Sequence, residues 1–366
     1  MIDKSLNRIF GLDLLRCFAV FEVVIGHSRL LINQYSNSPF IHLPDGVDLF
    51  FVLSGYLIGT ILIKAAEEKQ KFDFKSALNF LKRRWFRTLP NYYLFLIINI
   101  ILIYYGFGDG VLDNYLATFF VFLQTFNKPH DSFFYESWSL SVEEWFYFLF
   151  PLALLLINRV AKNKISIKKN IFFAILFFLI LPLIYRIYHI NEVLDFNSYY
   201  RKLVLTRLDT IAFGFVGAYI HWYYVGFWQK NKNIFFLLGF TMLISLNLGC
   251  IPFSLFYKSF YYSFIGVSIL LMLPKLESLK NENIPLKPVR FISKISYSMY
   301  LVHMPLLQII CKIFIVTNKT ESIIIYVIFW LTTLLLSYVV YNFYELPIMN
   351  LRDKTRKQLA KEKSDL

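Results

Sequence analysis

Apolar runs long enough to cross a membrane recur along the whole chain, separated by short polar connections. A helix needs about 20 mostly apolar residues to span a bilayer. Eleven segments approach that length, near residues 12–32, 47–63, 89–105, 111–127, 138–157, 170–188, 203–224, 233–250, 255–274, 291–316 and 322–344. This pattern predicts an all-α polytopic integral membrane protein.

Basic residues mark one set of the connections between these segments. Lys and Arg gather near the N-terminus and in the stretches 64–88, 158–169, 230–232, 275–290 and 352–366. Residues 33–46 and 106–110 contain neither. Because positively charged connections stay in the cytoplasm, the chain is predicted to lie in the cell inner (cytoplasmic) membrane with both termini in the cytoplasm.

This sidedness allows only an even number of crossings between the basic connections 64–88 and 158–169, yet three apolar segments lie there. The segment 111–127 is the most polar of the three, so we predict that it is re-entrant or tilted and does not cross. About ten transmembrane helices then remain, with an amphipathic helix over 73–88 along the inner surface. We expect one membrane domain over 1–350 and a short basic tail over 351–366.

Composition agrees with a membrane protein and disfavours several other classes. Of the 366 residues, 57% are hydrophobic and 17% charged, against about 25% charged in soluble domains. The net charge of +14 sits in loops, as membrane topology requires, and does not indicate nucleic-acid binding. The three cysteines show no metal-ligand or disulfide spacing, and a cleavable signal peptide is not expected at this polar N-terminus.

Two ionisable side chains stand inside the first apolar segment. Arg16 and His27 are eleven residues apart, so they share a helix face about 16 Å apart along its axis. Ionisable groups are costly in a membrane and are functional candidates by default. His27 can serve as a general base near neutral pH, whereas Asp13 at i−3 could simply neutralise Arg16.

Further polar groups come from other segments. Glu143 and Glu144 are candidate partners for His27, and Glu143 is slightly preferred because Ser141 and Glu144 also match a structural capping box. We expect Asp48, Arg207 and Asp209 at the outer level, where they could contact a substrate, although Asp48 could instead cap its helix.

A second basic pair lies at the inner level. Arg84 and Arg87 are three residues apart and share a helix face, so their forked donors could grip phosphates. Ordinary positive flanking of a membrane helix is the structural alternative. Tyr297, Tyr300 and His303 form a stripe that is more typical of packing than of catalysis.

In this order and spacing, these motifs resemble those of the membrane-bound acyltransferase-3 family. The matching stretches include Arg16 through His27, Gly46-Val47-Asp48, Arg84-x-x-Arg87, Trp138 through Glu144, Tyr297-x-x-Tyr300-x-x-His303 and Glu345-x-Pro347. The resemblance implies a ten-helix domain that moves an acyl group, commonly acetyl, from cytoplasmic acyl-CoA to a hydroxyl of a cell-surface polysaccharide or glycolipid. It also implies functional roles for the Arg16–His27 pair and for Arg84 and Arg87.

We therefore expect an O-acetyltransferase with acetyl-CoA as donor co-substrate, no permanently bound cofactor and no metal. Arg16, Arg84 and Arg87 would bind the donor, His27 with Glu143 or Glu144 would catalyse transfer, and Asp48, Arg207 and Asp209 would position the sugar. The chain is expected to be the stand-alone form without an appended extracytoplasmic domain. The alternative is a transporter or flippase for a lipid-linked sugar, which would explain the buried charges but not Arg84-x-x-Arg87.

Overall fold

The regular elements of the protein are helices throughout the part of the chain that the structure describes. This computed structural model describes residues 9–32, 45–129, 133–161, 165–192, 195–248, 255–279 and 286–351. Within these ranges, ten helices have sixteen residues or more: α1 (Phe10–Ser28), α2 (Gly46–Lys69), α3 (Phe74–Tyr104), α5 (Ser137–Val160), α6 (Ile167–Tyr188), α7 (Val204–Tyr223), α9 (Lys232–Asn247), α10 (Leu255–Glu277), α11 (Leu286–Ile313) and α12 (Lys319–Val340). The all-α prediction is confirmed.

Shorter turns join these helices. They are η1 (Arg29–Leu31), α4 (Leu116–Phe119), the π-helical η3 (Phe196–Arg201), α8 (Val225–Lys230) and the π-helical η4 (Tyr341–Glu345). In the described chain, α2, α3, α5, α6, α10 and the run Lys319–Leu351 are long and apolar enough to cross a membrane. The count of ten crossings stays a prediction, and the basic tail from residue 352 lies outside the described residues.

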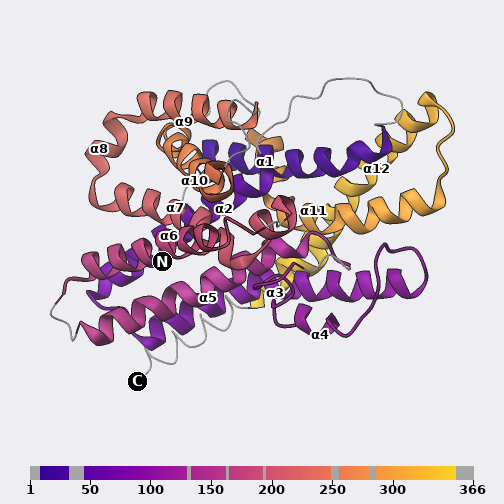
Figure 1. Ribbon diagram of the computed structural model, residues 1–366. Coiled ribbons are helices and arrows are strands. Elements are labelled where there is room, and N and C mark those ends of the chain that lie inside the picture. The colour runs from indigo at the N-terminus through magenta and orange to yellow at the C-terminus, as the bar shows by residue number, and fades with distance from the viewer. Residues whose placement is uncertain are drawn as a thin grey trace, which may run out of the picture.

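Contacts between distant segments bring the basic connections to one end of the helix bundle. Asn158 at the end of α5 donates to the carbonyl oxygen of Phe72, 3.1 Å away, in the α2–α3 connection. At the start of α6, the Lys168 ammonium lies 4.8 Å from the ring centroid of Tyr223. Trp228 of α8 donates to Glu277 at the end of α10 (2.9 Å). We call this the basic end; it lies toward α8, at the left of Figure 1.

The other helix termini meet at what we call the opposite end. Arg201 of η3 pairs with Asp45, which precedes α2 (2.7 Å). The Val204 amide donates to Thr125 (2.9 Å), and Lys312 of α11 lies 3.4 Å from Asp109. Helices that leave the basic end therefore reach this second set of contacts.

The region 73–127 differs from the prediction in one respect. The residues predicted as an amphipathic helix over 73–88 are not an element of their own, because Phe74–Tyr104 forms one continuous helix through Pro90; their position along the inner surface stays a prediction. Asp73 caps this helix by accepting hydrogen bonds from the Ser76 amide (2.8 Å) and hydroxyl (2.7 Å), which lower the pKa of the Asp73 carboxyl. A capped N-terminus and a proline in an otherwise apolar run allow a single long helix here.

The segment 111–127 contains only the four-residue helix α4. Tyr92 donates to the carbonyl oxygen of Phe119 (2.7 Å), although Tyr92 lies twelve residues before the end of α3. At 1.5 Å per residue, the segment thus reaches about 18 Å along α3. It returns to the start of α5, where Gln124 contacts Ser137.

Close helix packing holds the centre of the bundle. Helices α2 and α7 meet at Gly55 and Gly214, where an added Cβ would lie 2.1 Å from the Ile211 oxygen and 2.2 Å from the Val52 oxygen, respectively. Small residues let membrane helices approach closely. This contact fixes α2, whose other side chains line the site described next.

Candidate active site

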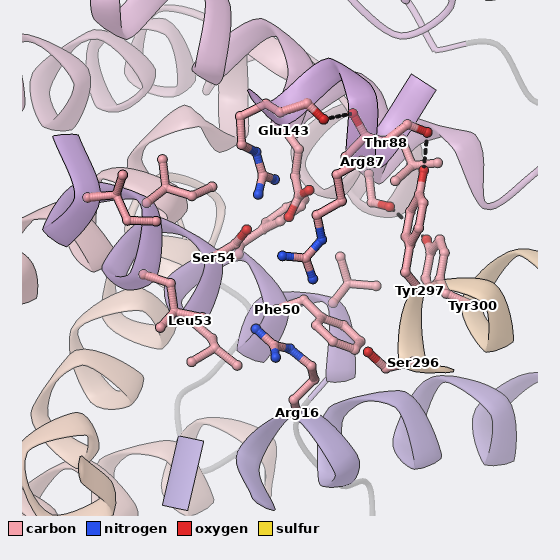
Figure 2. A pocket seen from close by; sticks show the side chains of 18 residues that line it. Arg16, Phe50, Leu53, Ser54, Arg87, Thr88, Glu143, Ser296, Tyr297 and Tyr300 are labelled. Atoms are coloured by element: carbon pink, nitrogen blue, oxygen red, sulfur yellow. Dashed lines mark hydrogen bonds between the residues drawn. The ribbon is translucent and has the colours of Figure 1, made fainter. Parts of the chain in front are cut away.

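Five helices enclose a cavity of about 140 Å³ in the middle of the bundle (Figure 2). Its polar lining consists of Arg16 of α1, Ser54 of α2, Arg84, Arg87 and Thr88 of α3, Ser139 and Glu143 of α5, and Ser296, Tyr297 and Tyr300 of α11. Val47, Phe50, Phe51, Leu53 and other apolar side chains complete the wall. The structure therefore brings together all three arginines that the sequence analysis assigned to donor binding.

The arginines give this cavity an excess of positive charge. Figure 2 shows the side chains of Arg16 and Arg87 pointing into the same space. The Arg84 guanidinium lies 4.3 Å from the ring centroid of Tyr147, and its buried Nε has no hydrogen-bond partner. Glu143 is the acidic residue among the lining side chains. Three forked cations facing one carboxylate suit an anionic ligand.

Arg16 is held differently from the other two arginines. Its Nη1 lies 3.7 Å from the Asp13 carboxylate and donates to the Ser293 hydroxyl at 3.4 Å. Ser293 in turn donates to Asp13 (2.6 Å). The predicted contact between Asp13 and Arg16 is thus present, and Arg16 still lines the cavity.

The two adjacent glutamates have different surroundings. Glu143 lines the cavity, near Ser54 in Figure 2, whereas Glu144 accepts a hydrogen bond from the Thr88 hydroxyl of α3 (2.6 Å). The alternative capping box is wrong, because α5 begins at Ser137 with Glu136 as its N-cap. Glu144 therefore links α5 to α3, and Glu143 is the carboxylate available to a ligand.

His27 lies outside this lining, and its partner is another histidine. Its Nδ1 is 2.9 Å from Nε2 of His303, and the two rings stack with centroids 5.1 Å apart. His303 is fully buried on α11. The expectation that Glu143 or Glu144 orients His27 is wrong. His303 belongs to the stripe with Tyr297 and Tyr300, whose spacing alone is more typical of packing.

Tyr300 connects the cavity to this histidine pair. It lines the cavity, and its hydroxyl donates to the Glu136 carbonyl oxygen (2.9 Å) and hydrogen-bonds to Ser139 (2.7 Å). Its ring centroid is 5.8 Å from that of His303, one helical turn further along α11. The cation-lined cavity and the histidine pair are therefore neighbours, with Tyr300 between them.

The three residues predicted to position a sugar are all engaged in ion pairs at the opposite end. Asp48 pairs with Arg207, and Asp209 pairs with Arg186 (2.7 Å), with the side chains almost fully buried. None of these residues lines the cavity around Arg84. Arg186 is a further site residue that was not predicted; its position inside an apolar segment was the available signal.

A further pair adds charge next to His27. Arg201 binds Asp45 through Nε (2.9 Å) and Nη2 (2.7 Å). Both residues, together with Lys202, are charged neighbours of His27. The surroundings of the histidine pair at the opposite end are thus polar, in contrast to the exposed apolar surfaces of the helices.

Comparison with known families decides what kind of protein has this arrangement. The sequence profile of the acyltransferase-3 family, described as an acyltransferase domain, matches residues 9–342. The chain belongs to this family. The acyltransferase-3 match covers all the described helices that line the cavity, from α1 to α11, so the arginines and the histidine pair lie inside the family domain.

Curated relatives carry related names. The chain is 30% identical to "O-acetyltransferase OatA" of Staphylococcus aureus strain MRSA252, over 97% of this chain and 59% of that protein. It is 26% identical to "Peptidoglycan O-acetyltransferase OatA" of Listeria monocytogenes, over 86% of this chain and 52% of that protein. The chain thus spans about three fifths of the first of these relatives and half of the second. No solved structure matches it.

Proposed function

We propose that this acyltransferase-3 protein is an O-acetyltransferase that moves an acetyl group from acetyl-CoA, supplied at the basic end, to a sugar hydroxyl at the opposite end. The acceptor is a cell-surface polysaccharide or glycolipid. The observation that carries this proposal is the single cavity in which three arginines converge and which Tyr300 joins to the His27–His303 pair. The names of the relatives support the choice of acetyl.

The arginines account for donor binding. Arg84 and Arg87 hold the phosphates of coenzyme A, since neither makes an ion pair with any residue that the structure describes, and forked donors suit phosphate oxygens. Arg16 binds the pantetheine arm or its phosphate. Because α1 places His27 about 16 Å beyond Arg16, the arm carries the thioester toward Tyr300 and the histidines.

The histidine pair accounts for the chemistry. With Nδ1 of His27 bonded to His303, Nε2 of His27 is the atom that takes the proton from the sugar hydroxyl. The sugar oxygen then forms a bond to the acyl carbon, the carbon–sulfur bond breaks, and the thiolate of coenzyme A takes up the proton. While His27 is protonated, His303 accepts a hydrogen bond from its Nδ1–H and so stabilises the imidazolium. A carboxylate has this role in the serine-protease triad.

The topology completes the proposal. Positively charged connections usually stay in the cytoplasm, and this favours an orientation with the basic end and both termini on that side, from which acetyl-CoA would enter. The transporter alternative gives no reason for the unpaired Arg84 and Arg87, and the family is one of acyltransferases. Coenzyme A binding in detergent separates the two: a transporter shows none.

The test is transfer of radiolabelled acetyl from acetyl-CoA to lipid-linked or surface glycan in membranes. We expect His27→Ala to lose at least about 10²-fold in rate, the contribution typical of a positioned base. His221→Ala is the matched control, because His221 bonds to Glu277 (3.1 Å) near the basic end. Near-normal transfer by His27→Ala would remove the general-base role.

A further inference from the structure

A second cavity lies at the opposite end and is separate from the one around Arg84. Its volume is about 450 Å³, within the range of about 300–1,000 Å³ that is usual for small-molecule sites. It is bounded by the end of α6, by η3, by the start of α7 and by residues 127–129. We call it the outer cavity; the mechanism above does not use it.

The floor of the outer cavity holds an incompletely bonded cation. Arg186 is fully buried, and its Nη atoms bind Asp209 (2.7 Å), the Thr206 carbonyl (2.6 Å) and Ser263 (2.7 Å). Its buried Nε has no hydrogen-bond partner. Leaving a buried donor unsatisfied costs about 1–3 kcal/mol, so a ligand oxygen at the floor would be favoured.

Aromatic side chains with polar ends form the walls of the outer cavity, and contacts within the protein hold them in position. The Tyr185 ring lies 4.6 Å from that of His189, whose Nδ1 is 2.8 Å from Glu192. Tyr200 donates to the His189 carbonyl oxygen (3.0 Å). Such rings offer an apolar surface and a hydrogen-bonding edge, which match the C–H face and the hydroxyl rim of a sugar ring.

The rim carries a cation that pairs with no described residue. The exposed Lys128 makes no ion pair with any residue that the structure describes, and the Lys258 ammonium lies 3.4 Å from the Glu192 carbonyl oxygen. Among the described residues that line the cavity, the carboxylate is that of Glu192, which His189 already contacts at 2.8 Å. The entrance therefore favours an anionic substituent over a neutral one.

The outer cavity also lies beside the histidine pair. Tyr199 and Tyr200 of η3 line it, and the next residue, Arg201, binds Asp45. Arg201 and Asp45 are the charged neighbours of His27. η3 thus contributes both to the outer cavity and to the charged surroundings of His27.

From these observations we infer that the outer cavity binds an acidic sugar residue of the acceptor, a saccharide that carries a carboxylate or a phosphate. The sugar ring packs against Tyr185 and His189, one of its oxygens meets Arg186, and the acidic group meets Lys128. This inference rests on the proposed function, because it names the acceptor that the acetyl group reaches. It also replaces Asp48, Arg207 and Asp209 as the sugar contacts.

The test is saturation-transfer NMR with the full chain in lipid nanodiscs. Three matched probes are N-acetylglucosamine, its 6-phosphate and N-acetylmuramic acid, which adds a carboxylate. We expect both acidic sugars to bind more tightly than the neutral one. Lys128→Gln should weaken the acidic sugars alone about two- to fivefold, as for an exposed ion pair. The acid that binds more tightly identifies the substituent.

Two variants make the outcome decisive. Lys230→Gln removes the same charge near the basic end and should change nothing, and Asn127→Trp at the exposed rim should block all three sugars. No binding by any sugar, or equal binding by Lys128→Gln and Lys230→Gln, overturns the inference. Acetyl transfer without sugar binding refutes the outer cavity alone, and sugar binding without acetyl transfer refutes the proposed function alone.

Discussion

Glu143 and Glu144 are neighbours in sequence, but their carboxylates serve different surroundings. Glu143 lines the cavity with Arg84 and Arg87, whereas the Glu144 carboxylate accepts from Thr88 at 2.6 Å. Adjacent positions on a helix point about 100° apart. At the scale of single residues, the direction in which a side chain leaves its helix therefore decides its role. Glu143 can contact a ligand, whereas Glu144 connects α5 to α3.

This difference yields a prediction. Glu143→Gln keeps the size of the side chain but removes the negative charge among the arginines. Since interactions of a charged group contribute about 1.5–3 kcal/mol, we expect acetyl transfer to fall about tenfold or more. Glu144→Gln retains an oxygen that can accept from Thr88, so it should keep most of the activity. Steady-state rates with acetyl-CoA check this; a larger loss for Glu144→Gln would contradict it.

Helix α2 shows what packing contributes at the scale of an element. It runs beside α7 with Gly55 against the Ile211 carbonyl oxygen, and the same turn carries Ser54 and Leu57 to the lining of the cavity. The backbone contact is close because neither helix has a side chain at the crossing. The lining of the cavity depends on that closeness.

Gly55→Ala should therefore destabilise the protein. The new Cβ would lie 2.1 Å from the Ile211 oxygen, and relieving such a contact typically costs about 1–3 kcal/mol. Gly226→Ala on α8 is the control, since an added Cβ there meets nothing within 4 Å. Thermal unfolding in detergent should show a lower midpoint for Gly55→Ala only; equal midpoints would contradict the packing argument.

At the scale of the whole molecule, the two ends of the bundle differ in charge and in content. The basic end gathers lysines and arginines, and the opposite end holds buried pairs such as Arg186–Asp209 and the outer cavity. The proposed route of the acetyl group runs between them. The proposed function therefore depends on which side of the membrane each end faces.

Cysteine accessibility in a background without Cys17, Cys250 and Cys311 checks the sidedness. We expect Asp109→Cys and Lys128→Cys to react with an impermeant reagent added to intact cells. Lys230→Cys should react only after the membrane is opened. Labelling of Lys128→Cys from the cytoplasm alone would reverse the assignment of 111–127 as the non-crossing segment.

The sequence by itself determined most of the elements. Hydropathy and charge are local properties, and they placed ten of the eleven apolar segments on the long helices that the structure describes. They also singled out Arg16, Arg84, Arg87 and Glu143, since charge inside or beside a membrane segment is conspicuous without a fold. The continuity of α3 was missed, because polar residues over 73–88 favour a surface helix when taken alone.

Only the tertiary structure decided which of these groups meet. His27 and His303 are separated by 276 residues, and no local pattern shows that α1 and α11 place their rings in contact. Likewise, Arg207 binds Asp48 and Asp209 binds Arg186, so residues that looked available for a sugar are already paired. A buried charge takes whichever partner the packing of distant helices brings to it, and that packing depends on the whole chain at once.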